Sequence, residues 1–246
     1  MNQDKTLKIL IDNIIDIRIN KNQMYFLKKH SWNSKTIEQE ISNLDYNGEK
    51  RVKDDKVENA YLPPFIIAFY MYLFEKTKIP KEQELFKLYL DLFYDHINEN
   101  NVKIKQKYID VYTNNIFSKE GVLTRLLRSY PSLIRDFHFL ILCFESNLFD
   151  KSYYSLNIDY FDGYDIIVKY SGCTFGVSLH INSSRGNYYK NKKRYRHTYN
   201  NLHEIVIKAT KEECVEYGTI RLFTTKHVKQ LKIKITEYLD NEKKQV

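Results

Sequence analysis

One stretch of the chain combines cationic and tyrosine side chains in a way that suits contact with nucleic acid. From Asn182 to His203 the sequence contains no acidic residue. Lysine and arginine neutralise phosphates, and tyrosine rings stack on exposed bases or hydrogen-bond to the backbone. The alternative is a solvated basic helix face whose tyrosines pack on a sheet. The predicted contacts are Arg185, Tyr188, Tyr189, Lys190, Lys192, Lys193, Arg194 and Arg196.

Alternating apolar residues on both sides of this stretch predict the strands that position it. Two turn pairs, Asp162-Gly163 and Ser171-Gly172, separate the first three runs and predict antiparallel neighbours. The long crossover that follows permits parallel pairing of the fourth strand, which would give a mixed sheet flanked by helices. The runs are YYSLNIDYF, YDIIVKY and TFGVSLHI before the basic stretch, and EIVIKA and TIRLF after it.

Strand parity places polar side chains of the second and third runs on one face of the sheet. Asp165 shares a face with Ile167 and Lys169, because residues two apart in a strand point the same way. In the third run Ser178 and His180 point away from the face expected in the core. Antiparallel pairing should therefore bring Asp165 toward these two residues. The alternative for Asp165 is turn chemistry, since Asp is favoured next to a turn.

Apolar residues at helical spacing predict that the first half, to about Tyr112, is helical, with a polar exposed loop between Tyr46 and Asn59. Pro63 and Pro64 open one helix of this half, and Pro131 is predicted to open an apolar helix in the second half. A final amphipathic helix is marked by Val228, Leu231, Ile235 and Leu239. We expect two domains, with helical residues 1–120 for recognition or dimerisation and residues 121–246 as an α/β domain.

This order of elements, with an acid opening the second strand, resembles the PD-(D/E)XK nuclease superfamily. The core of that family is a helix, an antiparallel meander of three strands, a crossover helix and further strands. The resemblance covers roughly half of the chain, and it rests on this order and on Asp165. It implies a restriction-endonuclease-like fold, a mixed α+β or α/β architecture, with Asp165 as a ligand of Mg²⁺ or Mn²⁺. The family's third strand carries an acid, any residue and a lysine, whereas this chain has Ser178 and His180 at those positions.

Other residues are needed to complete such a site. Glu145 and His138 lie two helical turns apart on one face of the helix before the strands. A site of Glu145, Asp165, the Leu179 carbonyl and His180, as ligand or general base, is chemically reasonable. The alternatives are an exposed acid for Glu145 and a core histidine for His138.

The basic stretch offers groups that could act beside the metal. Arg185 is predicted to hold a scissile phosphate, because it follows the third strand directly. Lys190 or Lys193 is predicted to replace the lysine that the third strand lacks. Ser178 reads as a small spacer, since no nucleophile elbow surrounds it.

Three functions remain open on these grounds. The first is a metal-dependent DNA endonuclease of a restriction, mobile-element or defence system. The second is a nucleic-acid-binding protein that keeps the nuclease fold without catalysis. The third is a helical interaction or regulatory protein whose charge reflects A+T-rich codons. DNA is favoured over RNA as the partner, and a homodimer is a further expectation.

Charge and composition agree with an anionic partner. The chain has 246 residues and a formal net charge of +8, with 39 Lys and Arg against 31 Asp and Glu. Its three cysteines, at wide spacing, match neither a disulfide framework nor a zinc half-site. The first residues lack the plan of a signal peptide, and the apolar run from Phe65 to Phe74 is too short to span a bilayer. We therefore expect a soluble, cytoplasmic protein with no membrane partner.

Overall fold

The protein is described by a computed structural model that covers residues 32–44, 46, 48, 52–60, 62–104, 116–156, 158–181 and 202–244. These residues belong to two compact units. The described part of the first unit lies within Glu40–Leu133, and the second unit contains Trp32–Gln39 and Ile134–Val246. The boundary falls inside a helix, and the division expected at residue 120 stays a prediction.

The first unit contains the helices α4 (Asp55–Glu58), α5 (Phe65–Lys76) and α6 (Glu82–Phe93). Pro64 is the N-cap residue of α5, in agreement with the prediction that Pro63 and Pro64 open this helix. Thr77 ends the helix in the left-handed conformation. One side of α6 is buried, including the fully buried Tyr89. Helix α4 lies within the segment that was predicted to be a loop, and the Asp54 side chain caps it.

A three-stranded antiparallel sheet in the first unit departs from the predicted all-helical half. Its strands are β1 (Tyr94–His96), β2 (Asn101–Ile104) and β3 (Ile116–Ser118), in that order. Strands of three or four residues are too short to show a clear alternation, and β1 follows α6 without a break. The prediction of a helical first half is therefore wrong for β1 and β2, which lie between residues 94 and 104.

Helix α7 (Lys119–Glu145) begins earlier than predicted and contains Pro131 in its interior. The prediction that Pro131 opens this helix is wrong. In the first unit the Arg125 guanidinium donates to the carbonyls of Val57 and Ala60. These bonds tie α7 to the C-terminal end of α4 and to the residues that follow it.

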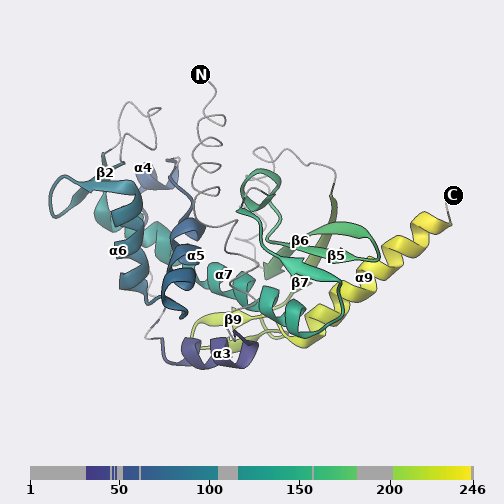
Figure 1. The fold of residues 1–246 in the computed structure, drawn as a ribbon. Coiled ribbons are helices and arrows are strands. Elements are labelled where there is room, and N and C mark those ends of the chain that lie inside the picture. The colour runs from purple at the N-terminus through teal and green to yellow at the C-terminus, as the bar shows by residue number, and fades with distance from the viewer. Residues whose placement is uncertain are drawn as a thin grey trace, which may run out of the picture. The chain divides into compact units, whose positions relative to one another are not determined.

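The second unit is organised around a four-stranded mixed sheet, and Figure 1 shows three of its strands, β5, β6 and β7, side by side. Neighbours pair antiparallel from the first to the second and from the second to the third, and parallel from the third to the fourth. The antiparallel pairing of the second and third strands and the parallel pairing of the third and fourth agree with the prediction. The strands are β4 (Lys151–Tyr153), β5 (Ile166–Tyr170), β6 (Cys173–Ile181) and β7 (His203–Ala209).

The turns at the two ends of β5 differ from one another. Ser171 and Gly172 both have positive φ, 51° and 78°, which is the geometry of the tight hairpin turn predicted from this pair. Gly163 instead follows the single π-helical turn η2 (Ile158–Asp162). The first predicted strand is therefore wrong beyond Tyr153, because its later residues fold into η2 and the segment that leads to it.

Helix α9 (Thr225–Lys243) lies along this sheet in Figure 1 and contacts β7. Its buried residues Val228, Leu231 and Ile235 confirm the predicted apolar stripe. Tyr238 of the same helix stacks on His203 of β7, with ring centroids 3.6 Å apart. Together these residues cover the sheet face that carries Phe175 and Val177 of β6.

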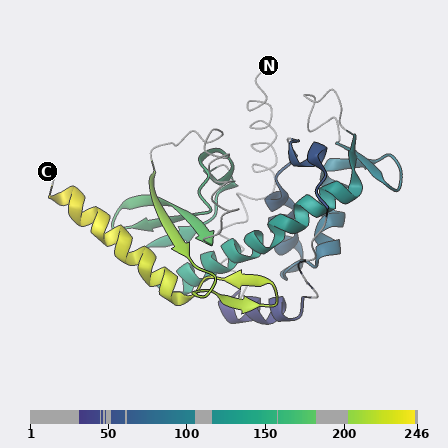
Figure 2. The same cartoon turned by 180° about the vertical axis from the view of Figure 1, so that it is seen from behind.

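A small hairpin, β8 (Val215–Tyr217) and β9 (Ile220–Leu222), completes the second unit. Figures 1 and 2 both show it next to the start of α3 (Ser34–Ser42), where the Tyr217 hydroxyl donates to Glu38 at 2.9 Å. Among the described residues, no helix has the length and apolar character needed to cross a membrane.

Gly176 in β6 lies against the ring of Tyr164 and has no room for a side chain. A Cβ at this position would stand 2.4 Å from Tyr164 Cγ, and the Tyr164 hydroxyl is anchored to the Leu202 carbonyl at 3.2 Å. We expect Gly176→Ala to lower the free energy of unfolding by about 1–3 kcal/mol, measured by urea denaturation. In a Tyr164→Ala background the same change should destabilise less, because the ring is gone. An equal loss in both backgrounds would contradict this account.

Candidate functional site

Asp165 stands directly before β5, and its side chain is bound to the neighbouring strand. Its backbone N–H donates to the Val177 carbonyl at 2.9 Å, and its carboxylate Oδ2 accepts the Leu179 N–H at 2.6 Å. The residue is half-buried. The carboxylate is therefore bound to β6 and is held at the position expected from the strand register.

Glu204 belongs to β7, the strand that flanks β6 on the edge opposite to β5, and its side chain reaches the same part of β6. The buried Ser178 hydroxyl donates to Glu204 Oε1 at 2.6 Å. In the observed register Ile166 pairs with Val177, so Asp165 is opposite Ser178. Two carboxylates, one directly before β5 and one in β7, thus reach the backbone or side chain of adjacent residues in β6.

The position of Lys208 adds a cation to this face of the sheet. His180 of β6 pairs in register with Lys208 of β7, and Gly176 pairs with Glu204. Paired residues of neighbouring strands point to the same face. An acid, Glu204, and a lysine, Lys208, therefore lie on β7 on the sheet face that carries Ser178 and His180.

No family model, curated protein or solved structure matches the chain. We use the name β5–β7 site for the group of Asp165, Ser178, Glu204, His180 and Lys208. Its two carboxylates offer oxygen ligands of the kind that Mg²⁺ and Mn²⁺ prefer.

Glu204 and Lys208 are absent from the predicted site residues, although both lie in the predicted fourth strand, EIVIKA. Alternation within that run puts both on the face opposite to the buried Ile205 and Ile207. Their distance from Asp165 along the sheet depends on the parallel register between β6 and β7. No turn fixes that register, so the sequence alone could not align them with Ser178 and His180.

Glu145 has a different partner from the one predicted for it. It is exposed at the last residue of α7, where its Oε1 accepts the backbone N–H of Ser34 at 2.8 Å. This bond satisfies an N–H at the start of α3. Within the described residues, no group of three or more His, Cys, Asp and Glu side chains is arranged to hold a metal ion. The described residues therefore do not group Glu145, Asp165 and His180 around a metal position. A metal site made of these three residues stays a prediction.

His138 is a buried residue of α7 with an acidic partner. Its Nε2 lies 3.1 Å from Glu38 Oε1, and the other carboxylate oxygen of Glu38 accepts the Tyr217 hydroxyl. Burial lowers the pKa of His138, although the charges of Glu38 and Glu145 oppose the shift. Burial and then the Glu38 carboxylate raise the pKa of Tyr217 to about 12. The cluster joins α7, α3 and the β8–β9 hairpin, which agrees with the core interpretation of His138.

The pKa of His138 predicts a loss of stability in mild acid. A folded-state pKa below the ordinary value means that the unfolded chain binds this proton more readily. The contribution of His138 to stability is then complete above a pH of about 6.5 and is lost as the pH falls through the lower folded-state pKa. The free energy of unfolding should decrease by at most about 1.4 kcal/mol per pH unit for this proton.

Denaturation of the wild type and of His138→Gln between about pH 8 and pH 5 checks this prediction. The variant should show a flatter dependence on pH, because only the wild type takes up the His138 proton on unfolding. His227, whose pKa burial also lowers, contributes equally to both proteins. Parallel curves would show that His138 does not carry the effect.

The predicted nucleic-acid contacts lie outside the described residues. They are Arg185, Tyr188, Tyr189, Lys190, Lys192, Lys193, Arg194 and Arg196. The basic segment leaves β6 at Ile181 and returns at β7, so both of its ends join the strands that carry the β5–β7 site.

Proposed function

We propose that the protein is a metal-dependent endonuclease acting on DNA, with its centre at the β5–β7 site. The observation that carries the proposal is the approach of two carboxylates to adjacent residues of β6. Asp165 is bound to Leu179 and Glu204 is bound to Ser178, each at 2.6 Å. Carboxylates fixed in this way can hold a divalent cation next to a phosphodiester.

The arrangement of strands supports the same proposal. Helix α7 precedes the antiparallel meander β4–β5–β6, and β7 returns parallel to β6. This is the order expected from the resemblance to the PD-(D/E)XK core. Asp165 opens the second strand of the meander, which is the position of the metal-binding aspartate in that family.

Mg²⁺ or Mn²⁺ fits the donor set. Mg²⁺ is often held by one or two carboxylates, with water and substrate phosphate oxygens as its other ligands, so a third protein ligand is not required. Asp165 and Glu204 would hold the ion. The Leu179 N–H and the Ser178 hydroxyl orient these carboxylates through the bonds already described. When bound, the ion supplies a lowered pKa for an attacking water and neutralises phosphate charge.

The remaining residues of the site have roles that follow from their chemistry. His180 is half-buried and can accept a proton from water as a general base. Lys208 is exposed beside it and can hold a phosphate oxygen by a charge-assisted bond. Lys208 thus joins Lys190 and Lys193 as a candidate for the lysine that β6 lacks.

The proposed substrate is DNA, because the basic, tyrosine-rich segment between β6 and β7 suits phosphates and bases. A restriction, mobile-element or defence system is the setting in which such an enzyme would act.

The test is cleavage of supercoiled plasmid by the purified protein with Mg²⁺, with Mn²⁺ and with EDTA. The wild type should nick or linearise the plasmid with metal, and Asp165→Asn should not. Asp240→Asn on the exposed face of α9 is the matched control and should cleave normally. The proposal is overturned if the wild type fails to cleave with either metal, or if Asp165→Asn cleaves as well as the wild type.

A second candidate is a nucleic-acid-binding protein without catalysis. It is favoured by Ser178 and His180 at the positions where the family has an acid and a lysine. This protein would bind DNA with an affinity that falls steeply with salt, but would leave plasmid intact with Mg²⁺ and Mn²⁺. Binding measured at two salt concentrations alongside the cleavage assay separates the two candidates.

A further inference from the structure

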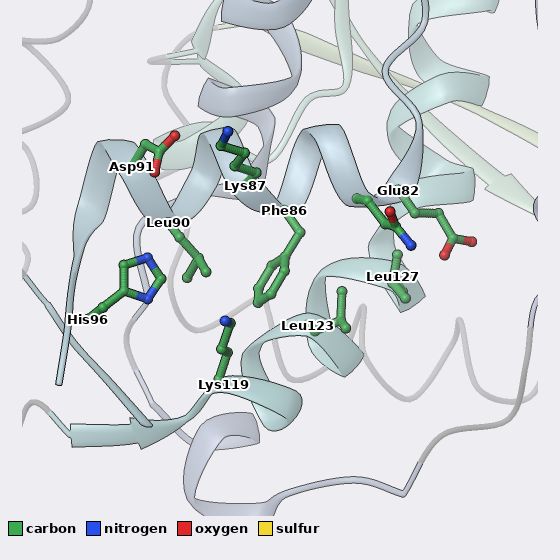
Figure 3. Close-up of a pocket in the computed structure, with 10 residues that line it drawn as sticks. Glu82, Phe86, Lys87, Leu90, Asp91, His96, Lys119, Leu123 and Leu127 are labelled. Atoms are coloured by element: carbon green, nitrogen blue, oxygen red, sulfur yellow. The ribbon is translucent and has the colours of Figure 1, made fainter. Parts of the chain in front are cut away.

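A concave site of about 300 Å³ lies in the first unit, between α6 and the first turns of α7, with His96 of β1 among its lining residues (Figure 3). This volume is at the lower end of the range found for small-molecule sites in proteins. The site belongs to the unit that does not contain Asp165 or Glu204. It is therefore separate from the proposed nuclease centre.

The floor of this groove is apolar and comes from two helices. Phe86 and Leu90 are four residues apart in α6, and Leu123 and Leu127 are four residues apart in α7, so each pair lies on one helix face. Phe86, Leu90 and Leu127 are buried, and Leu123 is half-buried. A ligand that enters the groove would meet an aromatic ring and aliphatic side chains.

Two side chains of the groove that can donate hydrogen bonds, Lys119 and His96, lie beside its apolar floor. In Figure 3 Lys119 extends toward Phe86, and the His96 ring lies beside Leu90. The described residues provide no ion pair and no side-chain hydrogen bond for either Lys119 or His96.

The acids of the lining already interact elsewhere. After burial, the charge of Glu82 contributes to the raised pKa of Tyr46 and of Tyr130, and Glu82 has an interaction within the chain. Asp91 also has an interaction within the chain, and Figure 3 shows its carboxylate turned away from Lys119. Lys119 is therefore the charged side chain that Figure 3 shows extending toward the apolar floor.

We propose that this groove binds a small amphipathic anion, a carboxylate attached to a compact aromatic or aliphatic body. The apolar body lies on Phe86, Leu90 and Leu127, and the carboxylate accepts hydrogen bonds from Lys119 Nζ and from a ring nitrogen of His96. A charge-assisted bond next to apolar surface is stronger than one in open water, which gives selectivity for the anion.

The proposal is tested with 2-naphthoate as the probe and the full-length protein in a calorimetric or ligand-observed NMR titration. The uncharged 2-naphthamide has the same shape without the charge, and 2-naphthylmethylammonium carries the opposite charge. Naphthoate should bind at least about tenfold more tightly than the amide, since the amide forms only neutral hydrogen bonds. The ammonium compound should bind more weakly still.

Two lysine variants locate the binding site. Lys119→Met keeps an apolar chain of similar length and should reduce naphthoate affinity to that of the amide. Lys76→Met, at the exposed end of α5 in the same unit, should leave naphthoate binding unchanged. Absence of naphthoate binding, equal affinity for naphthoate and the amide, preference for the ammonium compound, or unchanged binding by Lys119→Met would each overturn the proposal. Because the readout is binding at the first unit, it does not depend on whether the second unit cleaves DNA.

Discussion

Glu204→Gln is expected to reduce metal-dependent DNA cleavage on the order of 10²- to 10³-fold, as for the loss of one strong electrostatic contact in an active site. The substitution keeps the length of the side chain and an oxygen that can accept the Ser178 hydroxyl. It removes only the negative charge. A loss of activity therefore reports on the charge at this position rather than on the packing of β7.

The measurement is the initial rate of plasmid nicking as a function of Mg²⁺ concentration, with melting curves to show that each variant is folded. Ser178→Ala should reduce the rate by about 10- to 100-fold, because it removes a group that orients the carboxylate and not a ligand. Glu237→Gln on an exposed part of α9 is the matched control and should behave as the wild type. Wild-type rates and metal dependence for Glu204→Gln would remove Glu204 from the site, leaving Asp165 to be tested separately.

Leu231→Ala should lower the free energy of unfolding by about 2–5 kcal/mol, the range for deletion of a buried leucine side chain. Leu231 is completely buried in α9, between Val228 and Ile235 on the side of the helix that covers the sheet. Removing it leaves a cavity in the layer that also contains Phe175 and Val177.

The matched control for Leu231→Ala lies on the same helix. Ile233 is 56% exposed, and Ile233→Ala should change the free energy of unfolding by about 0.5 kcal/mol or less. Chemical denaturation of the two variants and the wild type gives both values. Similar losses at the two positions would contradict the assignment of the buried face of α9.

The central elements of the second unit could be predicted because their residues repeat with a clear period. Alternation in YDIIVKY and TFGVSLHI, with Ser171 and Gly172 between them, determines both strands and their antiparallel pairing. The stripe of Val228, Leu231 and Ile235 similarly predicts α9. The parallel pairing of β7 follows from a crossover too long for a hairpin.

Other parts could not be predicted, for reasons that differ from element to element. Alternation in YYSLNIDYF suggests a strand, but Tyr154 donates to Asp159 at 2.8 Å and the chain forms the turn η2. Pro131 reads as the first residue of a helix, yet α7 extends for several turns before it. In the first case a local side-chain bond competes with the strand. In the second, the buried Leu126 and Tyr130 anchor the turns of α7 that precede the proline.

The candidate site was predicted in part. Asp165 and His180 follow from strand parity within single runs, and Asp165 lies where that parity places it. The sequence does not identify the second carboxylate of the proposed metal site. Glu145 and Glu204 are equally plausible acids until the register between β6 and β7 is known. The Ser178–Glu204 bond distinguishes them, since Glu145 is occupied at the start of α3.

Helix α7 belongs to both units, with Leu133 in the first and Ile134 in the second. Each turn of a helix is bonded to the next, so the hydrogen bonds around this boundary join residues of both units. A gene split at Leu133 would give one fragment whose last carbonyls have no partners and another that begins with unpaired N–H groups next to the buried Ile134 and Phe137. Both fragments should therefore be less stable than the same residues are in the intact chain, because each loses the helical hydrogen bonds that cross the boundary.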